Sequence, residues 1–149
     1  MARDPLHCFS PFYLVIPGAL MKLTIIKLDS LSSQDLLDLA KIWPRQSPGV
    51  WQQWLTPEQM IFAARFNDRL LAAVKVSVRD SRAKLDDLCV REVTRRRGVG
   101  LYLLEILQQQ LPKVAELTMD DIAEDAGLAA FMRACGFKLE EDVWRKSRN

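Results

Sequence analysis

The sequence almost lacks histidine. Its 149 residues include one, His7, which lies close to the N-terminus. Residues 1–20 are interpreted below as an extension, and residues 21–149 contain no histidine at all. In those residues, Ser-His-Asp and Cys-His catalysis and zinc sites built on histidine are therefore excluded. The chemistry of this protein must therefore come from other residue types.

Cysteine, charge imbalance and long apolar runs are also scarce. The three cysteines, Cys8, Cys89 and Cys135, form no CxxC pair and show no metal-ligand spacing. Their odd number favours a reducing compartment. A net charge of +2 is too small to indicate nucleic-acid binding. No stretch approaches the roughly 18 to 20 apolar residues that span a bilayer. We therefore expect a cytoplasmic protein that holds no metal and binds neither membrane nor nucleic acid.

Residues 1–20 differ in character from the rest of the chain. Pro5, Pro11 and Pro17 interrupt each short apolar run, so neither a helix nor a regular strand is expected there. A signal peptide would need an apolar core of roughly 7 residues or more, longer than the run between the prolines. We interpret residues 1–20 as an extension, either a start assigned too early or a disordered leader. Residues 21–149 then form one domain.

Apolar periodicity and turn residues predict an α/β or α+β layered domain. Helices are expected from Ser32 or Ser33 to Pro44, over 99–111 and over 128–135, with a further one near 48–55. Strands are expected near 22–28, 61–66, 70–78, 85–90, 114–119 and 137–144. Early hairpins and later βαβ units indicate a mixed sheet of about six strands flanked by helices.

Residues 61–78 are expected to form a hairpin of two strands. Asn67 and Asp68 tolerate the positive φ of a tight turn, so they are expected to join the two strands. In the second strand, Val74, Val76 and Val78 alternate with polar residues. This alternation predicts that Lys75 and its polar neighbours face water.

The most informative stretch is REVTRRRGVG at residues 91–100, which is followed by a helical pattern. The first N–H groups of a helix have no partner within the helix, and the helix dipole adds positive potential. Gly98 and Gly100 would let a phosphate approach the backbone, and Arg95 to Arg97 would bind its oxygens. The stretch therefore predicts a phosphate site, although neither nucleotide motif, GxxxxGK[ST] or GxGxxG, is present.

The run from Arg95 through Gly98 to Gly100 matches the R/Q-x-x-G-x-G/A pyrophosphate loop of the GNAT N-acetyltransferase superfamily, and the order of elements resembles that fold. Three stretches, LDDLCVREVTRRRGVG at 85–100, AARFNDRLLAAV at 63–74 and KIWP at 41–44, closely resemble the PanZ/PanM family. That family comprises small GNAT-like proteins that control aspartate 1-decarboxylase. The extension before Met21 has no counterpart in it.

The resemblance implies a coenzyme A site and a protein partner. Acetyl-CoA, or CoA, would bind Leu88, Cys89, Val90, Thr94, Arg95, Arg96, Arg97, Gly98, Val99, Gly100 and Leu101. The protein, a monomer when free, would bind the aspartate 1-decarboxylase proenzyme and promote its self-cleavage to the pyruvoyl form. It would also couple pantothenate and coenzyme A synthesis to the level of CoA thioester. Asn67, in the family-like block 63–74, is the expected partner contact.

Catalysis is less well supported by the sequence. In many GNAT enzymes a tyrosine four residues before a Gly-Phe pair protonates the departing thiolate; Gly136-Phe137 is present here, but that position holds Met132. An asparagine often found on the preceding turn corresponds to Asp125, and Tyr102 is expected to pack.

Weak candidates for a base remain, so no catalytic residue is assigned. They are Asp86, Asp87 and Glu92. Cys89 could accept an acyl group, although an apolar strand cysteine is usually inert. Cys135 is expected to belong to the core. A regulatory subunit is therefore favoured over an active N-acetyltransferase. A nucleic-acid binder that uses the arginine run is a distant third.

Overall fold

The computed structural model describes residues 13–16, 19–91, 98–122 and 125–147. Along the chain these residues form β1 (Tyr13–Ile16), β2 (Ala19–Lys22), β3 (Thr24–Lys27), α1 (Ser33–Ile42), α2 (Pro48–Gln52), β4 (Gln59–Phe66), β5 (Arg69–Arg79), β6 (Arg82–Val90), α3 (Val99–Gln110), β7 (Glu116–Asp120), α4 (Ala126–Ala134), β8 (Lys138–Glu140) and β9 (Val143–Ser147). Among these described helices, none is long and apolar enough to cross a membrane.

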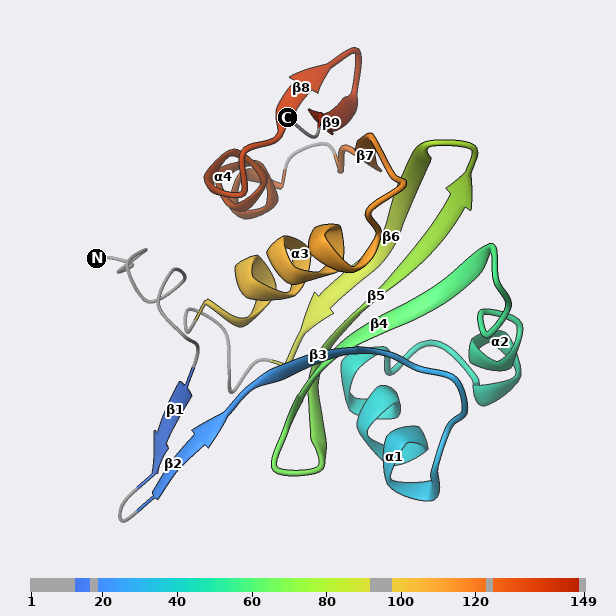
Figure 1. Cartoon of the computed structure of the whole chain (residues 1–149), viewed down its shortest axis with the longest axis vertical. Coiled ribbons are helices and arrows are strands. Elements are labelled where there is room, and N and C mark those ends of the chain that lie inside the picture. The colour runs from blue at the N-terminus through green and yellow to red at the C-terminus, as the bar shows by residue number, and fades with distance from the viewer. Residues whose placement is uncertain (1–12, 17–18, 92–97, 123–124, 148–149) are drawn as a thin grey trace.

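The centre of the molecule is a mixed sheet with strand order β3-β4-β5-β6-β7-β9-β8, and helices cover both of its faces (Figure 1). The β6–β7 pair is parallel, and the other pairs of this sheet are antiparallel. Helix α3 makes the crossover between β6 and β7, as a parallel pair requires. This confirms the predicted layered α/β class with a mixed sheet.

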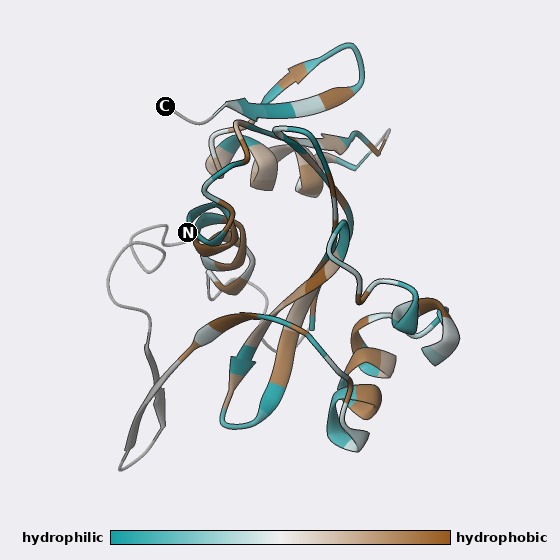
Figure 2. Cartoon of the chain, turned by 45° about the vertical axis from the view of Figure 1, so that its right-hand side comes forward, coloured by the Kyte–Doolittle hydropathy of each residue, from teal (hydrophilic) through white to brown (hydrophobic). Residues whose placement is uncertain are grey.

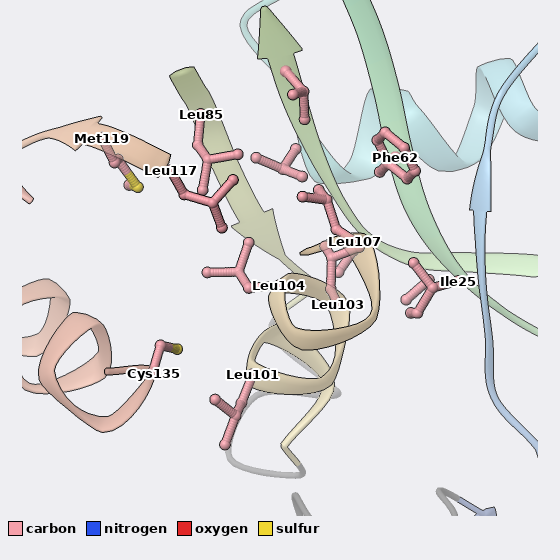
Figure 3. Close-up of a cluster of buried hydrophobic side chains, with 14 of the residues drawn as sticks. Ile25, Phe62, Leu85, Leu101, Leu103, Leu104, Leu107, Leu117, Met119 and Cys135 are labelled. Atoms are coloured by element: carbon pink, nitrogen blue, oxygen red, sulfur yellow. The ribbon is translucent and has the colours of Figure 1, made fainter. Parts of the chain in front are cut away.

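Each face of the sheet buries its own hydrophobic cluster. On one face, α3 and α4 pack on the sheet through residues such as Leu103, Leu107 and Cys135 (Figure 3). On the other face, α1 and α2 pack through Leu39 and Trp51. Hydrophobic residues accordingly concentrate in the central strands and in α3, whereas hydrophilic ones gather at the turns (Figure 2). The predicted position of Cys135 in the core is confirmed, because its side chain is buried.

Helix α1 begins and ends where the sequence indicates. The Ser32 hydroxyl accepts a hydrogen bond from the Asp35 backbone N–H, and the Asp35 carboxylate accepts one from the Ser32 N–H. The helix ends at Trp43, directly before Pro44. One apolar residue of this helix is not part of the core: Leu37 is 60% exposed, so it lies outside the stripe of α1 that faces the sheet.

Two segments differ from expectation. The single strand predicted over 137–144 is a hairpin of β8 and β9, because Glu141 and Asp142 adopt positive φ and reverse the chain. The main sheet therefore has seven strands in the described residues instead of about six.

Residues 1–20 were expected to form no regular strand, yet β1 pairs with β2 in a separate antiparallel ribbon. The reason lies in the sequence, because Pro11 and Pro17 flank the four residues of β1 and do not interrupt them.

Candidate functional site

The site lies where β6 separates from β7. The two parallel strands pair from Arg82–Glu116 to Leu85–Met119, and β6 then continues to Val90 beyond the last of these pairs. Leu88, Cys89 and Val90 follow, and all three apolar side chains are only half-buried although β6 lies inside the sheet. An apolar strand segment left open in this way can receive the body of an extended ligand.

A bulge precedes this segment. The register between β5 and β6 shifts between Ala73 and Lys75, so that two β6 residues, Asp87 and Leu88, face the single β5 residue Val74. Asp87 has a φ of 54°, which marks it as the distorted residue. Bulges redirect the strand that contains them, so this one sets the direction of Leu88 and of the residues after it.

The N-terminus of α3 forms the second part of the site. Gly98 caps the helix with a φ of 75°, a left-handed conformation that favours glycine, and its carbonyl accepts the Tyr102 N–H at 3.0 Å. The N–H groups of the first turn have no acceptor within the helix and can bind an anion. The predicted ligands Thr94, Arg95, Arg96 and Arg97 and the candidate base Glu92 lie outside the described residues.

Gly100 joins three elements. A Cβ at this position would lie 3.1 Å from the ring of Phe131 in α4 and 3.2 Å from Val90 Cγ2. The absence of a side chain therefore lets α3 approach both β6 and α4. Two predicted ligand residues, Val90 and Gly100, are brought together in this way, although they are ten positions apart in the sequence.

The candidate bases have different surroundings. Burial raises the pKa of Asp86, and the neighbouring carboxylates Asp87 and Asp120 raise it further, against the opposing effect of Lys84 and Lys75. Asp87 accepts hydrogen bonds at 2.8 Å from Lys75 and at 3.1 Å from Gln46. Asp87 is thus engaged in an ion pair, whereas Asp86 holds its proton more firmly than an ordinary aspartate.

The position of the usual acid is part of the core. Met132 is fully buried in α4, and its thioether cannot donate a proton. Asp125 caps α4 by accepting the Leu128 N–H at 2.8 Å. Tyr102 is half-buried against the α3-side cluster, in agreement with the predicted packing role.

The predicted partner contact lies at the far end of the β4–β5 hairpin. Asn67 and Asp68 have φ values of 51° and 65° and are exposed, which confirms the predicted turn. Ion pairs on both sides connect the hairpin to α1: Arg65–Asp35 at 3.1 Å and Arg69–Asp38 at 2.8 Å. The turn is therefore held in one position relative to α1.

One residue near the site was misjudged from the sequence. Lys75 was expected to face water, but it is only 4% exposed. Trp43 and Trp54 cover its ammonium group, and they come from the α1–α2 region some twenty to thirty positions earlier in the chain. The closely spaced tryptophans between residues 43 and 54 are the sequence signal that could have indicated a buried environment for Lys75.

The described residues contain no group of three or more His, Cys, Asp or Glu side chains suited to a metal ion. An open cleft of ≈ 680 Å³ lies at the β5–β6 turn and is lined by residues such as Arg79, Lys84 and Thr118. None of the predicted site residues that the structure describes lines this cleft.

The separating parallel pair, the bulge in β6 and the glycine start of α3 define a GNAT fold. An acetyltransferase structure from Bacillus anthracis, assigned to streptothricin and in complex with acetyl coenzyme A, superposes with a TM-score of 0.71; it is 16% identical and covers 87% of this chain and 99% of its own. At this identity the likeness concerns the fold alone.

The chain belongs to the PanZ family, because residues 22–145 match the family model described as acetyltransferase (GNAT) domain, PanZ. A PanD regulatory factor from Escherichia coli (strain K12) is 51% identical over 128 residues, which are 85% of this chain and 99% of the relative. The solution structure of the E. coli protein YhhK, assigned as an N-acetyl transferase and bound to coenzyme A, is 50% identical with a TM-score of 0.76; it covers 86% of this chain and 100% of its own.

Proposed function

We propose that this protein binds CoA or acetyl-CoA and, with that ligand, regulates aspartate 1-decarboxylase. The observation that carries the proposal is the open apolar segment Leu88–Val90 beside the glycine start of α3. The coenzyme A found with the 50% identical E. coli protein supports the ligand. The name PanD regulatory factor of the 51% identical relative supports the role.

The described residues fit such a ligand. Leu88 and Val90 offer half-buried apolar side chains on the α3 face, whereas Cys89 between them faces the α1–α2 side. The first turn of α3 offers N–H groups to a phosphate. Arg95, Arg96 and Arg97 would neutralise the pyrophosphate, because guanidinium groups bind phosphate oxygens in pairs. The acetylated ligand, when bound, supplies an activated acyl group at its thioester.

The regulatory role is preferred over acetyl transfer because the described part of the site lacks a suitable acid. Met132 is fully buried, and Asp87 is paired with Lys75. Asp86, with its raised pKa, remains the best base for the alternative. The partner would be the decarboxylase proenzyme, whose self-cleavage this protein promotes, with Asn67 in the contact. We place both proteins in the cytoplasm and expect this one to be a monomer when free.

We further propose that residues 21–149 are the functional unit and that residues 1–20 are an extension. The family model begins at residue 22, and the first described core side chain is Leu23.

Two assays run side by side test the function. The first follows cleavage of the proenzyme with this protein present or absent, and the second follows release of free thiol from acetyl-CoA in the presence of amines. We expect faster cleavage and no thiol release above the background. Amine-dependent thiol release that is lost in Asp86→Asn, without any effect on cleavage, would instead identify an acetyltransferase.

A further inference from the structure

Lys75 is a buried cation in the middle of the sheet. It lies on β5 opposite Asp86 and is 4% exposed, the one buried cationic residue in the part of the chain that the structure describes. Moving an ammonium group out of water is costly unless other groups replace its hydration. The surroundings of Lys75 should therefore form a site that is suited to a cation.

They do form such a site. The Nζ atom donates hydrogen bonds of 2.8 Å to Asp87 Oδ2 and of 2.8 Å to Gln46 Oε1. It also lies 5.1 Å from the ring centroid of Trp43 and 5.5 Å from that of Trp54. Both distances are within the range of cation–π attraction, which is strongest for tryptophan. A carboxylate, an amide oxygen and two indole faces thus surround one ammonium group.

The members of this site also hold one another in place without Lys75. Gln46 donates a hydrogen bond from Nε2 to Asp87 Oδ2 at 3.1 Å, and its Oε1 accepts one from Trp51 Nε1 at 3.0 Å. Trp43 Nε1 donates to the Asp87 carbonyl at 2.7 Å. The surrounding groups are therefore preorganised, and they should keep their arrangement when the lysine side chain is removed.

We propose that Gln46, Asp87, Trp43 and Trp54 form a binding site for a primary ammonium group, which the chain fills with its own Lys75. The site adjoins the β6 bulge directly before Leu88 and Cys89. By filling it, Lys75 excludes external amines from this side of the strand. That last consequence rests on the proposed coenzyme A site, whereas the ammonium site itself does not depend on it.

The ammonium site also gives a chemical reason for a sensor in place of a transferase. Acyl transfer needs a neutral amine with a free electron pair. The site provides a carboxylate and two indole faces, which attract a cation and not a neutral amine. Lys75 already occupies this position, so an external amine cannot take it.

The test removes the lysine side chain and offers a replacement. In Lys75→Ala, n-propylammonium matches the atoms that the substitution removes. Calorimetry in the absence of acetyl-CoA should show saturable binding to this variant with a dissociation constant of about 1 mM, as expected for so small a ligand. The neutral analogue n-propanol should bind at least tenfold more weakly.

Two controls define the result. The wild type should not bind n-propylammonium, and neither should Lys84→Ala, because Lys84 is about half exposed and pairs with Asp120 on the open surface. Absence of n-propylammonium binding to folded Lys75→Ala, or equal binding of n-propanol, would overturn the proposal. Because acetyl-CoA is left out, this result is independent of the proposed cofactor.

A second measurement needs no folded variant. Brief treatment of the wild type with acetic anhydride, followed by peptide mass spectrometry, compares the reactivity of individual lysines. The proposal predicts that Lys75 is acetylated at least tenfold more slowly than Lys84, since its amine is enclosed whereas that of Lys84 is about half exposed. Equal rates for the two lysines would overturn the proposal.

Discussion

Asp38 is fully buried in α1 and remains ionised because its carboxylate is well supplied with donors. Burial alone would raise the pKa of Asp38, but hydrogen bonds from Arg69, the Leu70 N–H and Gln34 outweigh burial and hold this pKa below its ordinary value. Arg69 donates from two nitrogens, in the bidentate geometry that favours arginine over lysine. This one residue fixes the start of β5 to α1.

We expect Asp38→Asn to lower the free energy of unfolding by about 1–3 kcal/mol at pH 7, because hydrogen bonds to a charged acceptor are lost. Asp38 has a lowered pKa in the folded state, so its contribution is present above the unfolded pKa of about 3.9 and is lost as the pH falls through the folded pKa. The difference between wild type and variant should therefore shrink below about pH 4.

Urea unfolding at pH 7 and in acid measures this difference. Asp80→Asn is the matched control, since Asp80 is exposed and asparagine tolerates its φ of 55°. A difference between Asp38→Asn and the wild type that does not change with pH would contradict the account.

Gly98 offers a second prediction at the scale of one residue. Because its φ is 75°, alanine at this position should cost about 1–2 kcal/mol of stability. It should also weaken coenzyme A binding, since the start of α3 would move. Gly49→Ala is the control, because its position in α2 has no atoms within 4 Å of a new Cβ. Thermal unfolding and calorimetry with coenzyme A would detect both effects; equal behaviour of the two variants would argue against a role for the α3 start.

At this scale the sequence predicts what depends on neighbours along the chain. The Ser32 cap, the helix over 99–111 and the replacement of an acid by Met132 could all be predicted from the sequence. The environment of Lys75 was not, because strand alternation reports only which face a side chain occupies. That face is covered by Trp43 and Trp54 from another part of the chain, and their position depends on how α1 and α2 pack.

At the scale of elements, the β4–β5 hairpin is the clearest functional unit outside the cofactor site. Its turn residues have positive φ, and two ion pairs to α1 hold it from either side. A turn held so firmly loses little conformational entropy when a partner binds, which favours affinity. The proposed partner contact at Asn67 lies at its exposed end.

We predict that Asn67→Gly weakens decarboxylase binding at least tenfold while stability stays within about 0.5 kcal/mol, because glycine keeps the turn but removes the amide. Asp80→Gly is the matched control at the opposite end of β5, where the φ is also positive and the side chain is also exposed. Surface plasmon resonance on the immobilised decarboxylase would compare the two. Equal losses for both variants, or none for Asn67→Gly, would remove Asn67 from the interface.

The same scale shows why some turns were predicted and others were not. Asn67-Asp68 lies between two apolar strands and was recognised. Glu141-Asp142 was missed because glutamate rarely adopts positive φ, and the run from Phe137 to Trp144 was therefore predicted as one strand. The bulge at Asp87 gives no glycine signal either; hydrogen bonds from Lys75 and Gln46 and to its own carbonyl hold it in place.

At the scale of the whole molecule, the order of elements was sufficient for the fold. A glycine-containing loop between a strand and a helix, followed by a further strand, predicted a βαβ unit with a parallel pair and a crossover. The β1–β2 ribbon was not foreseen, because prolines can flank a strand as well as interrupt it. That ribbon lies outside the seven-stranded sheet of the described residues.

Removal of residues 1–20 should leave the site intact, since every described site residue lies beyond Leu23. We predict that the shortened protein binds acetyl-CoA within twofold of the full chain, as measured by calorimetry. A loss of tenfold or more, about 1.4 kcal/mol, would show that the extension contributes to the domain.

The central claim is that ligand and partner binding are coupled, and titration calorimetry with the decarboxylase tests it most directly. We predict that saturating acetyl-CoA raises the affinity of this protein for the decarboxylase at least tenfold, about 1.4 kcal/mol of coupling free energy. Linkage then requires that the decarboxylase raise the affinity for acetyl-CoA by the same factor. Identical partner affinities with and without acetyl-CoA would contradict the account.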